Sequence, residues 1–399
     1  MIPAFTFAAT PQLYFGSEKI TTLSSVLKTF GSSVLLVTGA RSFISSAAGY
    51  KLLDQLHAAD YIVKQCIIDQ EPTPAMIDSA VNLAAHAPPH VVVAIGGGSV
   101  LDAGKAIAAM LPLRESVKDY LEGVGTKTHP GVKIPFIAIP TTAGTGSEAT
   151  KNAVLSEIGD NGYKKSLRHT NFVPDIAIID PALTLSCPPM ITAASGMDAF
   201  TQLLESYLST AANPMTDALA YEGLKYISTS LTQVYADGSN LPARTAMALA
   251  SYLSGITLAN AGLGLVHGFA SAIGGYFDIS HGVICSSLMA SANKVTVRKL
   301  RSEKSNEAAL TKYAAIGRLF SDIDNKSDEY YIDSLLSHIE SLTHELKIPN
   351  LKAGGITSTD FEKIIKASDN KNNPAILNKE EMEEVLAMAS LTKSTIHNK

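Results

Sequence analysis

The sequence is poor in cysteine, with three such residues among 399, at positions 66, 187 and 285. An odd and sparse count excludes a disulfide framework and is typical of a chain in the reducing cytosol. The first 14 residues contain neither a basic segment nor a long apolar run, so they do not resemble a secretory signal peptide. We therefore expect a cytoplasmic protein.

Charge is also scarce, since charged residues make up 17% of the chain. The 32 Lys and Arg are outnumbered by 37 Asp and Glu, and this balance excludes a general nucleic-acid binder. Hydrophobic residues make up 46%, which excludes a disordered chain. A single core stops growing at roughly 250–300 residues, so the length predicts two domains.

Residues 245–277 contain no Asp, Glu, Lys or Arg, and the run is long enough to cross a membrane as a helix. It is interrupted by Asn260, His267 and six glycines, with a break at 261–264. These residues favour a pair of buried helices inside a globular domain, and we expect no membrane span.

The first half of the chain alternates short apolar runs, rich in β-branched residues, with helical stretches. Near-continuous runs of this kind are typical of strands that are covered on both faces. Alternation with helices predicts a parallel α/β sheet. The expected strands cover residues 32–38, 61–69, 90–95, 135–139 and 175–179, and the expected helices 41–57, 75–87 and 101–110.

After about residue 185 the strand signals disappear and long segments rich in alanine and leucine follow. We therefore predict an α/β domain over residues 1–184 and an all-helical domain over residues 185–399. Prolines at 181, 188 and 189 mark the boundary. The expected helices cover residues 192–210, 215–235, 243–259, 267–274 and 283–293.

A turn with three consecutive glycines, residues 96–98, follows a predicted strand and opens a predicted helix. The glycines allow a tight turn, and a helix N-terminus suits a phosphate group. The spacing lacks the last glycine of the dinucleotide fingerprint, at Leu101, and the Ser or Thr of a P-loop, at Ala106. A phosphate site and a turn without a ligand both remain open.

A second cluster of glycine and hydroxyl residues, 140–148, follows the next strand. Ligands of open parallel sheets bind at the carboxyl ends of the strands. Two such loops after consecutive strands favour one extended ligand with phosphates and hydroxyls over a polar surface loop.

Four residues of the helical half have the chemistry of metal ligands. Asp198 and Gln202 stand four residues apart, which places both on one helix face, and His267 and His281 are each followed by glycine. Two oxygen donors and two imidazoles could converge on one divalent cation. The alternative is that Asp198 pairs locally and the histidines are ordinary core residues, and both interpretations remain open.

Taken together and in order, these motifs resemble those of the iron-containing (group III) alcohol dehydrogenase family, whose relatives include glycerol dehydrogenase, maleylacetate reductase and dehydroquinate synthase. The resemblance covers nearly the whole chain. It implies a dinucleotide-binding α/β domain, a helical domain and an active site in the cleft between them. The segments that carry it are 12–16, 96–102 with Lys105, 140–148, 196–199, 267–268 and 281–282.

The resemblance also implies roles for single residues. The pyrophosphate would lie against Gly97, Gly98 and Ser99. The nicotinamide half would contact Asp102, Thr141, Thr142, Thr145 and Ser147, with further cofactor contacts at Lys164 and Leu183. The metal ligands would be Asp198, Gln202, His267 and His281, the last two also counted as catalytic.

We expect the chain to accept both NAD and NADP and to prefer NADP. NAD-preferring relatives often carry Asp at the position of Gly39, and its charge repels the 2′-phosphate of NADP. Here that repulsion is absent, and Arg41 and Ser42 are placed to hold the phosphate.

Two positions depart from the family pattern. Gln202 stands where the family usually has a histidine ligand, and Ser271 stands where it often has another histidine. An amide oxygen is a poorer donor than imidazole, so we expect a divalent cation, Fe²⁺ or Zn²⁺, held weakly or with little selectivity for iron.

The implied reaction is hydride transfer between a small alcohol or aldehyde and NAD(P), with a divalent metal as Lewis acid. A metal-independent reductase of the maleylacetate reductase type is the main alternative, because both departures favour it. A cyclase like dehydroquinate synthase needs Lys and Arg for a phosphate-bearing substrate, and residues 245–277 have none. A non-catalytic binding protein would show no cofactor turnover.

The β-prone residues 5–15 and the resemblance predict a homodimer or larger homo-oligomer.

Overall fold

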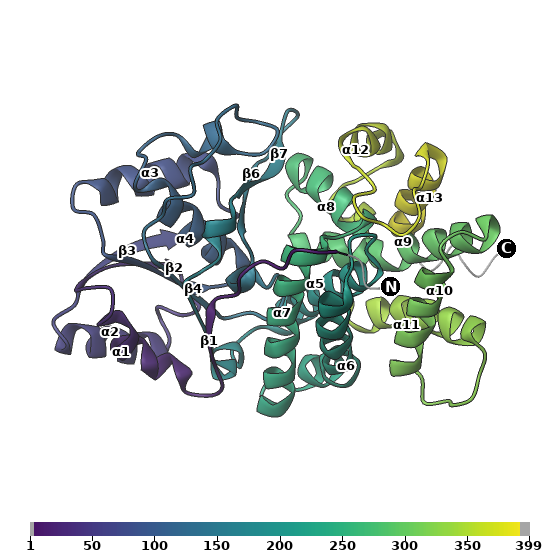
Figure 1. The fold of residues 1–399 in the computed structure, drawn as a ribbon, viewed down its shortest axis with the longest axis horizontal. Helices are drawn as coiled ribbons and strands as arrows, with labels where there is room; N and C mark the ends of the chain where they lie inside the picture. Colours follow the sequence, from purple (N-terminus) through teal and green to yellow (C-terminus); the bar gives the residue numbers. More distant parts are fainter. Residues whose placement is uncertain (1–3, 392–399) are drawn as a thin grey trace.

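The structure is a computed structural model that describes residues 4–391. Figure 1 shows an α/β part, built from the first half of the chain, beside a part made of helices. The predicted fold class is confirmed. The predicted domain boundary, 184/185, falls between the 3₁₀ helix η5 (Pro181–Thr184) and helix α5 (Pro189–Leu208).

Six parallel strands form one sheet in the order β1-β8-β5-β4-β2-β3. All five strands predicted from the apolar runs are present, and β1 lies within segment 12–16, one of the segments that carry the family resemblance. The bounds are β1 (Gln12–Phe15), β2 (Ser33–Gly39), β3 (Ile62–Ile68), β4 (Val91–Gly96), β5 (Phe136–Pro140) and β8 (Ile176–Ile179).

Helices cover both faces of this sheet, as Figure 1 shows. The helices on one face are α1 (Leu23–Leu27) and α2 (Ala47–Ala58), and those on the other are α3 (Pro74–Ala85) and α4 (Gly98–Met110). Side chains of a strand alternate between the two faces. In β2, Leu35 and Val37 pack on the α3–α4 side, while Val34 and Leu36 pack on the α1–α2 side. Burial of both sets explains why the strand sequence is apolar without interruption.

A two-stranded antiparallel hairpin, β6 (Asn152–Glu157) and β7 (Tyr163–Arg168), was not predicted. Its burial alternates, with Ala153, Leu155 and Leu167 inside, and its other positions are largely polar. A short strand with one polar face lacks the continuous apolar run from which the sheet strands were predicted. The hairpin carries Lys164 of β7 to the cleft described below.

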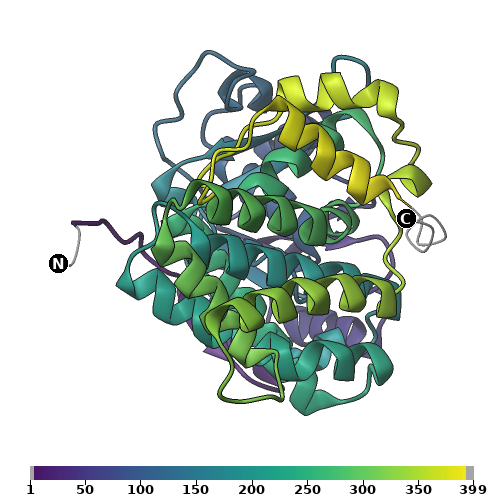
Figure 2. The ribbon, with the colours of Figure 1, turned by 90° about the vertical axis from the view of Figure 1, so that its right-hand side faces the viewer.

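Helices alone build the second half, and no strand occurs between residues 189 and 391. Figure 2 shows them stacked in front of the sheet. Helix α5 is buried on nearly all sides, as expected for a central helix. The others are α6 (Pro214–Ala236), α7 (Leu241–Ala261), α8 (Leu265–Tyr276), α9 (His281–Glu303), α10 (Glu307–Leu319), α11 (Asp328–Glu345), α12 (Phe361–Ala367) and α13 (Lys379–Ser390).

The uncharged stretch 245–277 forms parts of α7 and α8, which meet at an angle of 98°. Within residues 4–391, no single helix is long and apolar enough to cross a membrane. Only this bent pair passes such a test, by length and composition together.

Close backbone packing joins the two parts of the molecule. Gly146, in the loop after β5, has a φ of 60°, and a Cβ there would lie 2.5 Å from the backbone nitrogen of Gly255 in α7. Only glycine fits this left-handed conformation against a helix backbone without strain. The contact fixes the loop after β5 against the helical part, so the cleft between the parts has well-defined walls.

Candidate active site

A cleft of about 660 Å³ lies between the sheet and the helical part. The turn between β4 and α4 and the loop after β5 form one wall, because parallel strands end at the same edge of the sheet. The backbone N–H of Thr141 donates to the carbonyl of Gly96 at 2.9 Å, which ties the two loops together. The two glycine-containing motifs therefore meet, as the sequence predicted.

Gly97 is the N-cap of α4, and Gly98 is its first residue. A Cβ at Gly98 would lie 2.8 Å from Cγ2 of Thr145, so a larger residue would push the two loops apart. The first N–H groups of a helix lack partners within the helix and favour an anion. This end of the cleft therefore has the chemistry of a phosphate site.

Asp102 connects the parts of this wall. Its carboxylate accepts hydrogen bonds from the hydroxyl of Ser147 and, at 3.1 Å, from the backbone N–H of Val154 in β6. Burial raises the pKa of Asp102. Lys105 is also buried, and its ammonium donates to the carbonyls of Ser147, Thr150 and Asn152 at 2.8–2.9 Å. Lys105 therefore holds the loop in shape and does not point towards a ligand.

Glu71 is a cleft residue that the sequence analysis missed. Its carboxylate accepts from Lys164 at 3.0 Å and from the hydroxyl of Ser99 at 3.2 Å. Burial alone would raise the pKa of Glu71, but the Lys164 ammonium outweighs it and holds that pKa below its usual range. Glu71 thus orients two of the predicted cofactor residues.

Most of the predicted cofactor residues line this cleft: Gly97, Gly98, Ser99, Asp102, Thr142, Thr145, Ser147 and Lys164. Three do not. Gly39 ends β2, where an added Cβ would lie 3.8 Å from Val100 of α4. Thr141 directly follows β5, and Leu183 packs with the apolar cluster on the α1–α2 side of the sheet.

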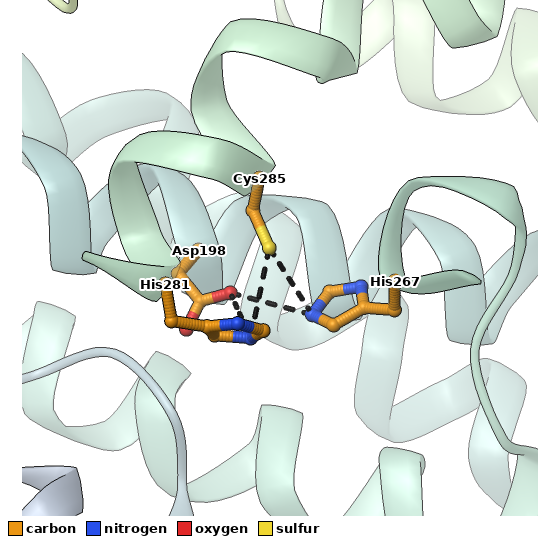
Figure 3. A group of neighbouring side chains, drawn as sticks. All are labelled: Asp198, His267, His281 and Cys285. Carbon is orange, nitrogen blue, oxygen red and sulfur yellow. Dashed lines mark hydrogen bonds and ion pairs between the residues drawn. The ribbon is translucent and has the colours of Figure 1, made fainter. Parts of the chain in front are cut away.

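Four side chains of the helical part converge on one another, as Figure 3 shows. Three of them, Asp198, His267 and His281, line the cleft. Asp198 comes from the middle of α5, His267 from α8, His281 from the start of α9, and Cys285 from one turn further along α9. One potential ligand atom of each lies within 4.8 Å of all the others. Asp198, His267 and Cys285 are buried, and His281 is partly exposed to the cleft.

The distances between these atoms are short but not those of strong hydrogen bonds. Oδ1 of Asp198 lies 3.4 Å from Nε2 of His267 and 3.8 Å from Nε2 of His281. The sulfur of Cys285 lies 3.6 Å from both of these nitrogens. Among the described residues, Oδ1 of buried Asp198 has no hydrogen-bond donor. A buried carboxylate oxygen without a donor is costly unless a cation neutralises it.

Burial and neighbouring charges shift the pKa values of the four groups. Burial disfavours the Asp198 carboxylate, but the His281 and His267 imidazoles outweigh it and lower its pKa. Burial also opposes a charge on His267, yet the neighbouring Cys285 and Glu205 raise its pKa well above the usual value. For His281, burial prevails and lowers the pKa to about 4. Burial raises the pKa of the Cys285 thiol to about 11.

Gln202 lies beside these residues and is buried. Its amide oxygen accepts from the hydroxyl of Ser254 at 3.1 Å, and its amide nitrogen lies 3.5 Å from Oδ2 of Asp198. The other departure from the family pattern, Ser271, lines the cleft and donates to the carbonyl of His267 at 2.9 Å.

The cluster suits a divalent metal ion. Carboxylate oxygen, two imidazole nitrogens and a thiol sulfur are ligands of iron and zinc. Sequence reasoning found three of the four and missed Cys285, although a His followed four residues later by Cys places both on one helix face.

The chain is similar to proteins of one known family along nearly its whole length. Residues 10–181 match the sequence family described as iron-containing alcohol dehydrogenase. Residues 192–390 match the family described as the C-terminal part of Fe-containing alcohol dehydrogenases. The chain is 30% identical to the NADPH-dependent butanol dehydrogenase of Clostridium saccharobutylicum, over 95% of this chain and 96% of the relative. It is 43% identical to long-chain-alcohol dehydrogenase 1 of Geobacillus thermodenitrificans, over 212 residues that span 53% of each.

Among solved structures, a 1,3-propanediol oxidoreductase superposes with a TM-score of 0.85 at 30% identity, over 97% of this chain and 100% of the other. The chain therefore belongs to the iron-containing alcohol dehydrogenase family. It is an oxidoreductase of the alcohol dehydrogenase type, and the family implies a nicotinamide cofactor and a divalent metal ion.

Proposed function

We propose that the chain transfers a hydride between a small alcohol or aldehyde and NADP(H), with a divalent cation at the centre formed by Asp198, His267 and His281. The observation that carries the proposal is that one cleft contains both this centre and the glycine turn at Gly97 and Gly98. The names of the relatives, which include a butanol dehydrogenase and a long-chain-alcohol dehydrogenase, support an alcohol substrate.

The residues at the two ends of the cleft have different roles in the proposed reaction. The helix N-terminus at Gly97 and the hydroxyls of the loop after β5 bind and orient the cofactor, whose phosphates suit the unpaired N–H groups. When bound, the nicotinamide ring accepts or supplies the hydride. When bound, the cation polarises the alcohol or carbonyl oxygen as a Lewis acid. The side chains of Asp198, His267 and His281 hold this charge beside the cleft.

The residues at and after the end of β2 support a preference for NADP over NAD. Gly39 brings no negative charge there, and Arg41 follows two residues later. The relative from Clostridium saccharobutylicum is named as NADPH-dependent, which supports the same choice.

A metal-independent reductase is the second candidate. It is favoured by Gln202, whose amide oxygen is already engaged by Ser254. Against it stands Oδ1 of Asp198, which is buried and has no donor among residues 4–391. A bound cation would neutralise that oxygen, whereas a metal-independent reductase has no partner for it.

We also propose a cytoplasmic homodimer. Strand β1 is an edge of the sheet, since its one sheet neighbour within the described residues is β8. Leu13 on this strand and Phe5 before it are both exposed. Exposed apolar residues beside an unpaired edge favour association with a second copy. Light scattering at micromolar concentration tests this, and a monomer mass would contradict it.

The test of the proposed reaction is the change in nicotinamide absorbance with a series of aldehydes and alcohols and with both cofactors. The wild-type chain is expected to turn over NADPH with small aldehydes. Asp198→Asn and His267→Ala are expected to lose turnover, while the surface variant Glu340→Gln keeps it. Turnover in none of these assays by a folded, metal-loaded chain would refute the proposal.

A further inference from the structure

We propose that the sulfur of Cys285 is the fourth protein ligand of the cation, that Gln202 stays outside the coordination sphere, and that the site therefore prefers zinc to iron. This inference rests on the proposed function, because it takes Asp198, His267 and His281 to be ligands.

The first argument is the distance between the sulfur and the two imidazoles. In a tetrahedral zinc site, with Zn–S of about 2.3 Å and Zn–N of about 2.0–2.1 Å, sulfur and nitrogen lie about 3.6 Å apart. The sulfur of Cys285 lies 3.6 Å from Nε2 of His267 and 3.6 Å from Nε2 of His281. Both nitrogens and the sulfur point towards one another in Figure 3.

The contacts of Asp198 follow the same pattern. Nitrogen and oxygen ligands of a tetrahedral zinc are about 3.3 Å apart. The Oδ1 atom of Asp198 lies 3.4 Å from Nε2 of His267 and, somewhat wider, 3.8 Å from Nε2 of His281. Direct hydrogen bonds between nitrogen and oxygen are shorter, at about 2.7–3.2 Å. The spacing thus suits a central ion better than a hydrogen-bonded cluster.

Burial gives an independent indication. Asp198 is 1% exposed, and its Oδ1 atom is aimed into the cluster without a hydrogen-bond donor among the described residues. If Cys285 were merely an apolar core residue, only the two imidazoles would offset the charge of this oxygen, and the oxygen would still lack a hydrogen-bond donor. A cation bound to both atoms compensates the oxygen and uses the sulfur.

Gln202 is less suited to the same role. Its amide oxygen, the only atom of the side chain able to ligate, accepts from Ser254 at 3.1 Å. The contact that Gln202 makes with Asp198 is through its amide nitrogen, which cannot ligate a cation and lies 3.5 Å from Oδ2. Ligation by Cys285 requires only that the thiol release its proton, as thiol ligands do on metal binding.

The donor set determines the choice of metal. Thiolate is a soft ligand that suits zinc, and four-coordinate sites with cysteine and histidine are typical of zinc. A thiolate and a carboxylate together also neutralise the charge of a divalent cation. We therefore expect Cys285 to contribute more to the binding of Zn²⁺ than to that of Fe²⁺.

Cobalt(II) substitution of the full-length chain tests the sulfur ligand directly. Thiolate bound to cobalt gives an intense near-ultraviolet charge-transfer band, whereas oxygen and nitrogen ligands give only weak visible bands. The wild-type chain is expected to show the intense band with one cobalt per chain. Cys285→Ser should lose that band, while Cys66→Ser and Cys187→Ser, which change the other two cysteines, should keep it.

Zinc affinity is the second measurement, by competition with a chromophoric chelator. Loss of a partner of a metal ligand costs about 10–100-fold in affinity, and loss of a ligand should cost at least as much. Cys285→Ser is expected to weaken Zn²⁺ binding by at least tenfold and Fe²⁺ binding by less. Gln202→Ala should leave the near-ultraviolet band in place.

The outcomes separate this inference from the proposed function. Cobalt bound with visible bands but no near-ultraviolet band in the wild-type chain overturns the role of Cys285 and leaves the proposed function standing. Failure of the folded wild-type chain to bind cobalt or zinc overturns both. Because the first readout uses the wild-type chain, it does not depend on whether a variant folds.

Discussion

Glu205 accepts a hydrogen bond from Nδ1 of His267 at 2.6 Å, and its other carboxylate oxygen accepts from the backbone N–H of Val266 at 2.7 Å. The bond places a proton on Nδ1, so Nε2, which faces Asp198 and Cys285, is the nitrogen available to a cation. Carboxylates that bond to a ligating histidine in this way fix its tautomer and raise its basicity. Glu205 is therefore a positioning residue for the metal centre.

We predict that Glu205→Gln lowers metal affinity by about 10–100-fold, because one amide oxygen cannot accept both bonds and carries no charge. Competition with a chelator measures the affinity, and circular dichroism checks the fold. Glu340→Gln is the control, since Glu340 pairs with Lys294 at the surface. An unchanged affinity in folded Glu205→Gln would show that the hydrogen bond does not support a metal ligand.

The cofactor preference is tested at Gly39. An added Cβ there finds no atom closer than 3.8 Å, so the site has room for a side chain. Gly39→Asp is predicted to shift the kcat/KM ratio from NADPH towards NADH by at least tenfold, or about 1.4 kcal/mol, through repulsion of the 2′-phosphate. Gly39→Ala should leave the ratio nearly unchanged. A ratio that is the same in Gly39→Asp and wild type would contradict the NADP assignment.

Stability should depend on pH through Glu148, a buried residue of the loop after β5. Burial raises its pKa from 4.5 to about 7. Between these values the folded chain keeps a proton that the unfolded chain releases, so stability falls as pH rises through this window. The titration of Glu148 changes the free energy of unfolding by at most about 3 kcal/mol.

Urea unfolding of the wild type and Glu148→Gln at pH 5 and pH 7 measures this effect, and the difference between the two chains isolates Glu148. The variant is predicted to lose less stability than the wild type between the two pH values. Equal losses in both chains would mean that Glu148 titrates normally in the folded state.

The fold was largely predictable from the sequence because burial on both faces leaves a continuous apolar pattern in strands such as β2 and β4. The hairpin β6–β7 was not, because its exposed face interrupts that pattern. Asp198 became a candidate ligand through its four-residue spacing from Gln202, and the two histidines through the glycine that follows each of them and through the family resemblance. Glu205 could not be assigned in that way, because its bond to His267 depends on how α5 packs against α8. The spacing of Cys285 from His281 was visible, but only the structure shows that both point to the same centre.

The central claim is that a divalent cation at Asp198, His267 and His281 is needed for turnover. The direct measurement is the rate of NADPH oxidation with an aldehyde in the chelator-treated chain, together with its metal content by elemental analysis. We predict that turnover disappears as the metal content approaches zero and returns when one equivalent of Zn²⁺ or Fe²⁺ is added. Full turnover in a chain that contains no metal would contradict the account and identify a metal-independent reductase.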